Sequence, residues 1–160
     1  MRFEHLVQIN DPLMPLLDTL TRSQLWRGLV MRIEDPVPFL YGLRGCTIED
    51  RSESCDVSTF ARTLDFGNFK VHDRVTLKPM DRVEVRAAAG ETYPASRLTI
   101  RIEEPGPELL FLRFLYEIGE SDNDSDIDPM TVAFRRQAYE NSDIDTVKRI
   151  RALAGRGMLG

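Results

Sequence analysis

A short hairpin whose register can be read from the residues constrains the fold of this chain more than any other segment. Two runs of alternating apolar and polar residues, 60–66 and 69–75, flank Gly67-Asn68, and a two-residue loop of this kind is typical of a tight antiparallel turn. Both loop residues can adopt the positive φ that such turns require. Because strand side chains alternate with a period of two, one face then carries four facing pairs. These pairs are Phe66 with Phe69, Leu64 with Val71, Arg62 with Asp73, and Phe60 with Val75.

One opposite-charge pair, Arg62 with Asp73, therefore lies within an otherwise apolar face. This pattern predicts a strongly curved sheet around an interior that is either a core or a ligand cavity. In a cavity, the pair would orient a polar group of a largely apolar ligand. In a core, it would be a structural pair that never meets a ligand. Mutual pairing is expected in both cases, because burying either charge alone is costly.

The composition fits one globular domain over residues 1–160. With 42% hydrophobic and 29% charged residues, the chain can bury a core and is not disordered. The net charge of −5 and the lack of a long basic stripe argue against nucleic acid as a partner. No apolar run approaches the roughly 20 residues that span a bilayer, which argues against integral membrane association.

The amino-terminal residues and the cysteines predict a cytoplasmic protein. The chain enters a strand pattern at once, with two charged residues among its first four, unlike a signal peptide. Cys46 and Cys55 are the only cysteines, and free thiols in a reducing compartment are the expected state. A disulfide across the loop between them is the alternative.

Along the chain, the pattern predicts a strand, a helix pair, six strands and a long terminal helix. The first strand covers residues 2–10, and Thr21-Arg-Ser-Gln24 is a capping box that begins a helix. That helix ends at Asp35-Pro36, and a second small helix is expected around 39–41. Further strands are predicted near 44–51, 57–66, 69–78, 82–88, 95–104 and 109–119.

The terminal helix begins after Asp128, which suits an N-cap with Pro129 at N1, and runs to about Ala154, where Gly155 and Gly157 end it. Residues 141–143 interrupt its apolar stripe, which indicates a kink or a partly wet middle section. The whole order argues for an α+β fold in which a seven-stranded curved antiparallel sheet grips the carboxy-terminal helix, with two short helices after strand 1.

Four segments carry a resemblance to a known family. They are residues 3–11 (FEHLVQIND), 20–29 (LTRSQLWRGL), 102–105 (IEEP) and 133–139 (AFRRQAY). With the order of elements, they resemble the helix-grip superfamily of START lipid-transfer domains, birch-pollen-allergen-like plant proteins and polyketide cyclases. More closely, they resemble its AtaL-like family, over essentially the whole chain.

The resemblance implies a deep apolar cavity between the sheet and the long helix, used for lipids, hormones, polyketides or other hydrophobic molecules. It transfers no catalytic set, because the family has none established. One departure is visible: residues 50–56 replace the glycine-rich loop of the plant proteins, which argues against an anion role for this loop.

Several side chains are candidates for the site. His5, on the apolar face of the first strand, could act as acid, base or hydrogen-bond donor, or it could be a core histidine satisfied by a backbone partner. Asp73 is the second catalytic candidate, and Tyr116 is a further polar anchor. Phe134 is expected on the side of the terminal helix that faces the sheet. The ligand-binding candidates as a set are His5, Trp26, Phe60, Arg62, Phe66, Phe69, Asp73, Leu98, Ile100, Phe114, Tyr116, Phe134 and Tyr139.

No cofactor or metal is expected. The chain has no nucleophile elbow, P-loop or dinucleotide fingerprint. The aspartates at 122, 124, 126 and 128 approach an EF-hand spacing, but Ile127 stands where the loop needs Gly and Ala133 where it needs Glu.

Three functions follow from these observations. The first is a protein that holds a hydrophobic or amphipathic small molecule between the sheet and the terminal helix. The second is a polyketide cyclase, dehydratase or isomerase in which His5 or Asp73 moves protons in the same cavity. The third is a non-catalytic homodimeric interaction module that uses the strand over 109–118, which is apolar on nearly both faces.

Overall fold

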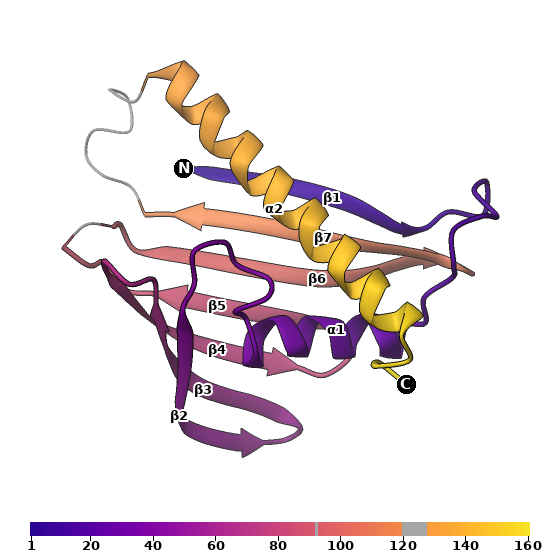
Figure 1. Ribbon diagram of the computed structural model, residues 1–160, viewed down its shortest axis with the longest axis horizontal. Coiled ribbons are helices and arrows are strands. Elements are labelled where there is room, and N and C mark those ends of the chain that lie inside the picture. Colours follow the sequence, from indigo (N-terminus) through magenta and orange to yellow (C-terminus); the bar gives the residue numbers. More distant parts are fainter. Residues whose placement is uncertain (92, 120–127) are drawn as a thin grey trace.

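The computed structural model describes residues 1–91, 93–119 and 128–160. Its elements in chain order are β1 (Arg2–Asn10), α1 (Arg22–Glu34), β2 (Gly45–Ser54), β3 (Val57–Asp65), β4 (Lys70–Lys78), β5 (Arg82–Ala87), β6 (Ser96–Gly106), β7 (Leu109–Ile118) and α2 (Pro129–Gly155). The strands form one antiparallel sheet in the order β1-β7-β6-β5-β4-β3-β2. Figure 1 shows α2 crossing the face of this sheet, with its carboxy-terminal end beside α1. The predicted α+β helix-grip fold is confirmed.

The hairpin between β3 and β4 has the predicted register. Arg62 faces Asp73, Phe60 faces Val75, and Leu64 faces Val71. Of the two loop residues, only Gly67 has a positive φ, of 86°. The alternation of apolar and polar residues was therefore sufficient to fix which side chains share the concave face.

The first helix begins where the capping box predicts. The Thr21 side chain accepts from Gln24 N at 3.0 Å, and the Gln24 side chain accepts from Thr21 N at 2.9 Å. After α1 the chain differs from expectation, because residues 36–42 form turns instead of a second small helix. Phe39 N and Leu40 N both donate to Pro36 O, but nearby prolines and Gly42, at a φ of 81°, allow no further helical turns.

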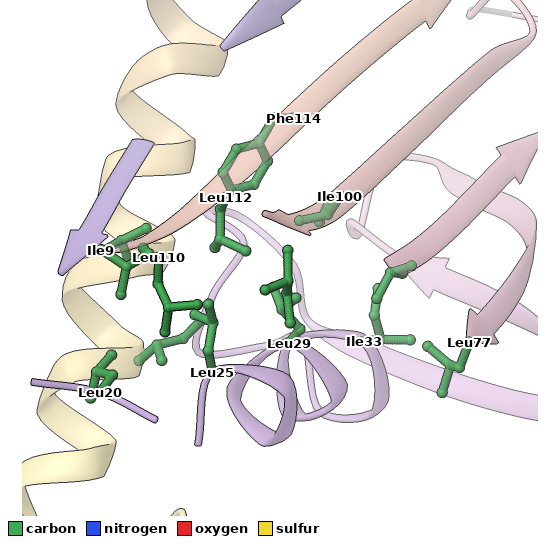
Figure 2. Packing of buried hydrophobic residues seen from close by; sticks show 14 of the residues in the cluster. Ile9, Leu20, Leu25, Leu29, Ile33, Leu77, Ile100, Leu110, Leu112 and Phe114 are labelled. Carbon is green, nitrogen blue, oxygen red and sulfur yellow. The ribbon is translucent and has the colours of Figure 1, made fainter. Parts of the chain in front are cut away.

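The first helix closes one end of the concave face. Leu25, Leu29 and Ile33 recur at helical spacing on its inner side and are completely buried. Figure 2 shows them pointing at side chains of β4, β6 and β7, among them Leu77, Ile100, Leu110 and Leu112. The strand ends beneath α1 are thus sealed by an apolar core.

The terminal helix also begins as predicted, with the Asp128 side chain accepting from Met130 N. Its first turns are exposed, whereas Asp143, Thr146, Val147 and Ile150 are buried. The helices α1 and α2 meet closely, because a Cβ added at Gly28 would lie 2.7 Å from Ile150 Cγ2. Among the described residues no helix is long and apolar enough to cross a membrane.

Candidate functional site

The strand ends away from α1 leave the sheet open. There, Asp73, Ala87, Ser96 and Ile118 face one another in turn across β4, β5, β6 and β7. We call these four residues the mouth row. Two of them, Ala87 and Ser96, have small side chains, so the row leaves space above the sheet. One row deeper, Val85 and Leu98 are only half-buried.

A depression of about 1050 Å³ lies at this open end. Its lining contains the mouth row, the adjoining Ala88, Ala95 and Gly119, and charged residues from the other side of the strand ends. The described residues of α2 do not contribute to this lining. This depression therefore differs from the cavity expected between the sheet and the terminal helix, which stays a prediction. The half of the sheet beneath α1 is filled by core side chains.

The pair Arg62 and Asp73 stands at one side of this opening. Arg62 Nε donates to Asp73 Oδ1 at 3.0 Å, and Nη2 donates to Oδ2 at 2.7 Å. The third nitrogen, Nη1, donates to Ile33 O at the end of α1 at 2.9 Å. Both side chains are buried, so the predicted mutual pairing is confirmed. Because both carboxylate oxygens are engaged by Arg62, Asp73 lines the depression as a neutralised partner of an arginine and not as a free base.

A second polar cluster lies under the middle of α2. Asp143 is completely buried, and its Oδ2 lies 3.1 Å from His5 Nδ1 on β1. Its Oδ1 accepts a hydrogen bond from the Tyr116 hydroxyl on β7. Nearby on α1, the buried Arg32 donates from Nε to Thr146 Oγ1 at 3.2 Å. The cluster therefore joins both helices to two neighbouring strands.

Burial governs the protonation of this cluster. It raises the pKa of Asp143 above its ordinary value, although hydrogen bonds from Tyr116 and His5 act in the opposite direction. Burial, followed by the charge of Asp143, also raises the pKa of Tyr116, so its hydroxyl stays a donor. Burial lowers the pKa of Arg32.

The cluster can perform acid–base chemistry in one particular way. With Asp143 ionised, His5 Nδ1 is the donor toward it, and the neutral ring then offers Nε2 as a proton acceptor. The His5 side chain is 19% exposed, so the ring as a whole is not sealed in the core. The alternative for His5 was a core histidine whose hydrogen-bond partner is a backbone group. The partner in the structure is instead the carboxylate of Asp143.

Asp143 was not among the predicted site residues. The sequence showed only that residues 141–143 interrupt an apolar stripe. The available signal was its spacing, because Tyr139, Asp143, Thr146 and Ile150 recur at one helical face and are all buried or half-buried. A carboxylate on such a face requires a partner inside the fold, and His5 and Tyr116 supply it.

The apolar and aromatic candidates divide between the core and half-buried positions. Phe60, Ile100 and Phe114 are completely buried. Tyr116 stacks on Phe3 and lies against Tyr139, with centroid distances of 4.8 and 4.5 Å. The candidates that are half-buried are Trp26, Phe66, Leu98 and Tyr139.

Two aromatic candidates lie at the surface, and the expectation that Phe134 faces the sheet is wrong. Phe134 is 77% exposed, because the first turns of α2 project beyond the apolar contacts that bury its second half. Phe69 is 47% exposed, since it stacks on Phe66 at the tip of the hairpin, at 5.0 Å between centroids. Neither side chain lines the depression or the core.

The strand predicted as a dimer surface, β7, lies between β1 and β6. Its inward residues Leu110, Leu112, Phe114 and Tyr116 are buried, which explains one of its two apolar faces. Its outward Phe111 and Leu115 are half-buried within the sheet. A homodimer through this face stays a prediction.

Residues 1–91, 93–119 and 128–160, which the structure describes, include both cysteines and both histidines. Within these ranges no group of three His, Cys, Asp or Glu side chains could hold a metal ion. The EF-hand-like spacing lies largely outside the described residues. Cys46 and Cys55 are free thiols.

The family model described as acetylaranotin biosynthesis cluster protein L, AtaL, matches residues 7–157. The chain belongs to the AtaL family. No curated protein matches it.

Several solved structures are similar in fold to this AtaL-family chain. The ZhuI aromatase/cyclase from Streptomyces sp. R1128 is 13% identical, with a TM-score of 0.60 over 98% of this chain and 94% of that one. The 18 kDa protein CC1736 from Caulobacter crescentus is 19% identical, with a TM-score of 0.63 over 96% and 99%. A START superfamily protein from Mycobacterium smegmatis is 13% identical, with a TM-score of 0.58 over 96% and 97%. At these identities the likeness shows the fold alone.

Proposed function

We propose that this protein binds a hydrophobic or amphipathic small molecule at the open end of its sheet. The observation that carries the proposal is the depression of about 1050 Å³ at the strand ends, whose lining includes the small side chains of the mouth row. Ligand sites for small molecules occupy roughly 300–1,000 Å³ and are concave and mostly apolar with a few polar groups. The half-buried Val85 and Leu98 beneath the row would extend its apolar floor.

The relatives support this proposal at the level of the fold. The family is described by a biosynthesis cluster, and one structural relative is an aromatase/cyclase. A START superfamily protein shares the same architecture. These likenesses favour small, carbon-rich molecules over a macromolecular partner.

Mass spectrometry of the freshly purified protein tests the proposal. A mass excess in the native spectrum that disappears on denaturation would support it and give the mass of the ligand. In parallel, the fluorescence of N-phenyl-1-naphthylamine, a neutral hydrophobic probe, reports binding to an empty site. A clean apo mass together with no probe binding would contradict the proposal.

A second candidate function rests on the cluster around Asp143. A cyclase, dehydratase or isomerase acting on a polyketide-like substrate could use His5 Nε2 to accept a proton, while Asp143 orients the imidazole. His5 lies opposite Phe114, two rows deeper along the sheet than Ile118 of the mouth row. A substrate must therefore reach past Tyr116. Turnover that disappears in His5→Ala while ligand binding persists would support the enzyme, and unchanged turnover would exclude this role for His5.

A further inference from the structure

Three arginines face one another across the sheet at the open end. Arg74 on β4 lies directly opposite Arg86 on β5, and Arg86 lies directly opposite Arg97 on β6. We call these three residues the arginine row. The row continues with Glu117 on β7 and Arg2 on β1, and all five residues line the depression.

This arrangement is unfavourable for the sheet itself. Side chains directly opposite on antiparallel strands have Cβ atoms about 4.5–5.5 Å apart, and like charges at this distance destabilise the pairing. The row contains two such pairings, Arg74 with Arg86 and Arg86 with Arg97, so the sheet bears this cost at both. The whole chain is acidic, with a net charge of −5, so the row is a local reversal of sign.

The row is poorly neutralised by the protein. Within the described part of the chain, Arg74 and Arg86 have no ion pair. Arg97 Nη2 reaches only Glu84 Oε1 at 3.8 Å, and the same oxygen already accepts from Arg82 Nε at 2.9 Å. The Nε atom of Arg97 is buried and has no hydrogen-bond partner among these residues. Buried donors are almost always paired, so the pairing of this N–H group requires a hydrogen-bond acceptor that a bound ligand can supply.

The acidic groups of the depression do not supply that acceptor. Asp73 is held through both oxygens by Arg62. Glu117 is a single carboxylate beside Arg97 and Arg2, and it forms no ion pair with either in the residues described. The lining thus combines unneutralised guanidinium groups with the apolar side chains of Ala87, Ala95 and Ile118.

We infer that the ligand is a hydrophobic organic acid. Its carboxylate or similar anionic group binds the arginine row on the outer face of the sheet, and its apolar body bends over the strand ends, past Ala88 and Ala95, to the mouth row on the inner face. Guanidinium groups bind carboxylates by short, charge-assisted hydrogen bonds, often in pairs. This inference rests on the proposed function and names the class of molecule that the depression takes. The anion would relieve the like-charge repulsion, so binding and stability are linked.

Two fluorescent probes separate the anionic contribution from the apolar one. 1-Anilinonaphthalene-8-sulfonate carries an anionic group on the same ring system that N-phenyl-1-naphthylamine presents without charge. In the Arg86→Gln/Arg97→Gln variant, the Kd of the sulfonate should rise about tenfold or more, because charge-assisted hydrogen bonds are lost. The Kd of the neutral probe should change less than about twofold. In the Arg86→Lys/Arg97→Lys variant, the Kd of the sulfonate should lie between the values for the wild type and for the glutamine variant.

A matched control removes two charges elsewhere. Arg101→Gln/Arg135→Gln changes the net charge equally at exposed positions outside the depression, and it should leave the Kd of both probes unchanged. An equal loss of sulfonate binding in this control would show a general charge effect and overturn the inference. Equal effects of Arg86→Gln/Arg97→Gln on both probes would overturn it as well.

The test also separates this inference from the proposed function. If the neutral probe binds and the Kd of the sulfonate is unchanged in Arg86→Gln/Arg97→Gln, the depression binds ligands but the inference of an anionic ligand is wrong. If neither probe binds the wild-type protein, both proposals fall. In the absence of ligand, Arg86→Gln/Arg97→Gln should unfold at a higher temperature than the wild type, and a lower midpoint would show that these arginines stabilise the sheet, against the inference.

Discussion

Asp143 Oδ2, in the middle of α2, lies 3.1 Å from His5 Nδ1 on the edge strand β1. The carboxylate is completely buried and also accepts from the Tyr116 hydroxyl, so one side chain of the helix is bound to two strands of the sheet. No other described residue of α2 forms a side-chain hydrogen bond to a side chain of the sheet. The middle of the gripping helix is thus positioned by contacts between side chains. In its last turns Arg151 donates to the backbone oxygens of Ile9 and Asp18, and Ile150 packs against α1.

The protonation of Asp143 should make stability depend on pH in a defined direction. Burial raises its folded pKa above the ordinary value of 3.8, so the folded state binds its proton more tightly than the unfolded state. The resulting stabilisation is complete below the unfolded pKa and is lost as the pH rises through the folded pKa. Asp143→Asn cannot titrate, so the unfolding free energy of the wild type minus that of this variant should fall as the pH rises from about 4.

Urea unfolding of both proteins at several pH values measures this difference. Glu49→Gln, which removes an exposed carboxyl on β2, is the control. A difference that rises with pH for Asp143→Asn would mean that the carboxylate is stabilised by its partners more than burial opposes it.

The buried pair Arg62 and Asp73 should show strong coupling. Asp73→Ala leaves a buried guanidinium without its partner, which should lower the unfolding free energy by about 3–5 kcal/mol. Replacing both residues by apolar ones, as in Arg62→Met/Asp73→Leu, should recover much of that loss. A double-mutant cycle in urea gives the coupling energy, and additive losses would contradict a close buried pair.

Gly28 should not accept a side chain. Ala is ordinarily favoured over Gly in a helix by about 1 kcal/mol, yet here the new Cβ would lie 2.7 Å from Ile150 Cγ2. Overpacking of this kind costs roughly 1–3 kcal/mol, so Gly28→Ala should destabilise the protein. Adding Ile150→Ala should make the effect of Gly28→Ala smaller or favourable, and thermal unfolding of the four proteins decides the sign.

A matched pair of substitutions locates the ligand site. Ala87→Phe fills the mouth row, whereas Ala138→Phe adds the same side chain at an exposed position of α2 outside the depression. Binding of N-phenyl-1-naphthylamine should be weakened at least about tenfold by the first change and little by the second. Unimpaired binding in a folded Ala87→Phe variant would place the site elsewhere.

The elements of this fold were readable from local chemistry. Alternation in 60–75 gave the register of β3 and β4, the capping box gave the start of α1, and Asp128-Pro129 gave the start of α2. Each of these signals involves residues close in sequence. The small helix after α1 could not be decided this way, because three apolar residues between turn-forming ones fit a helical turn and a bend equally well.

The site was less predictable because it depends on contacts between distant segments. The Arg62–Asp73 pair was found, since both residues belong to one hairpin. Asp143 was missed because its partners lie 138 and 27 residues away. Phe134 was misplaced because periodicity gives the face of a helix but not how far the helix extends beyond the sheet that it covers.

The closure of one strand end by α1 has a consequence for amide hydrogen exchange. Beneath Leu25, Leu29 and Ile33 the backbone amides are covered by a packed core, so they should exchange only when the whole domain unfolds. The other ends of the same strands, at Ala87 and Ser96, border solvent and can open by local fraying. Each strand therefore contains its own internal reference. A ligand at the open end would slow amide exchange there and leave exchange of the sealed amides unchanged. This difference would locate the ligand before its identity is known.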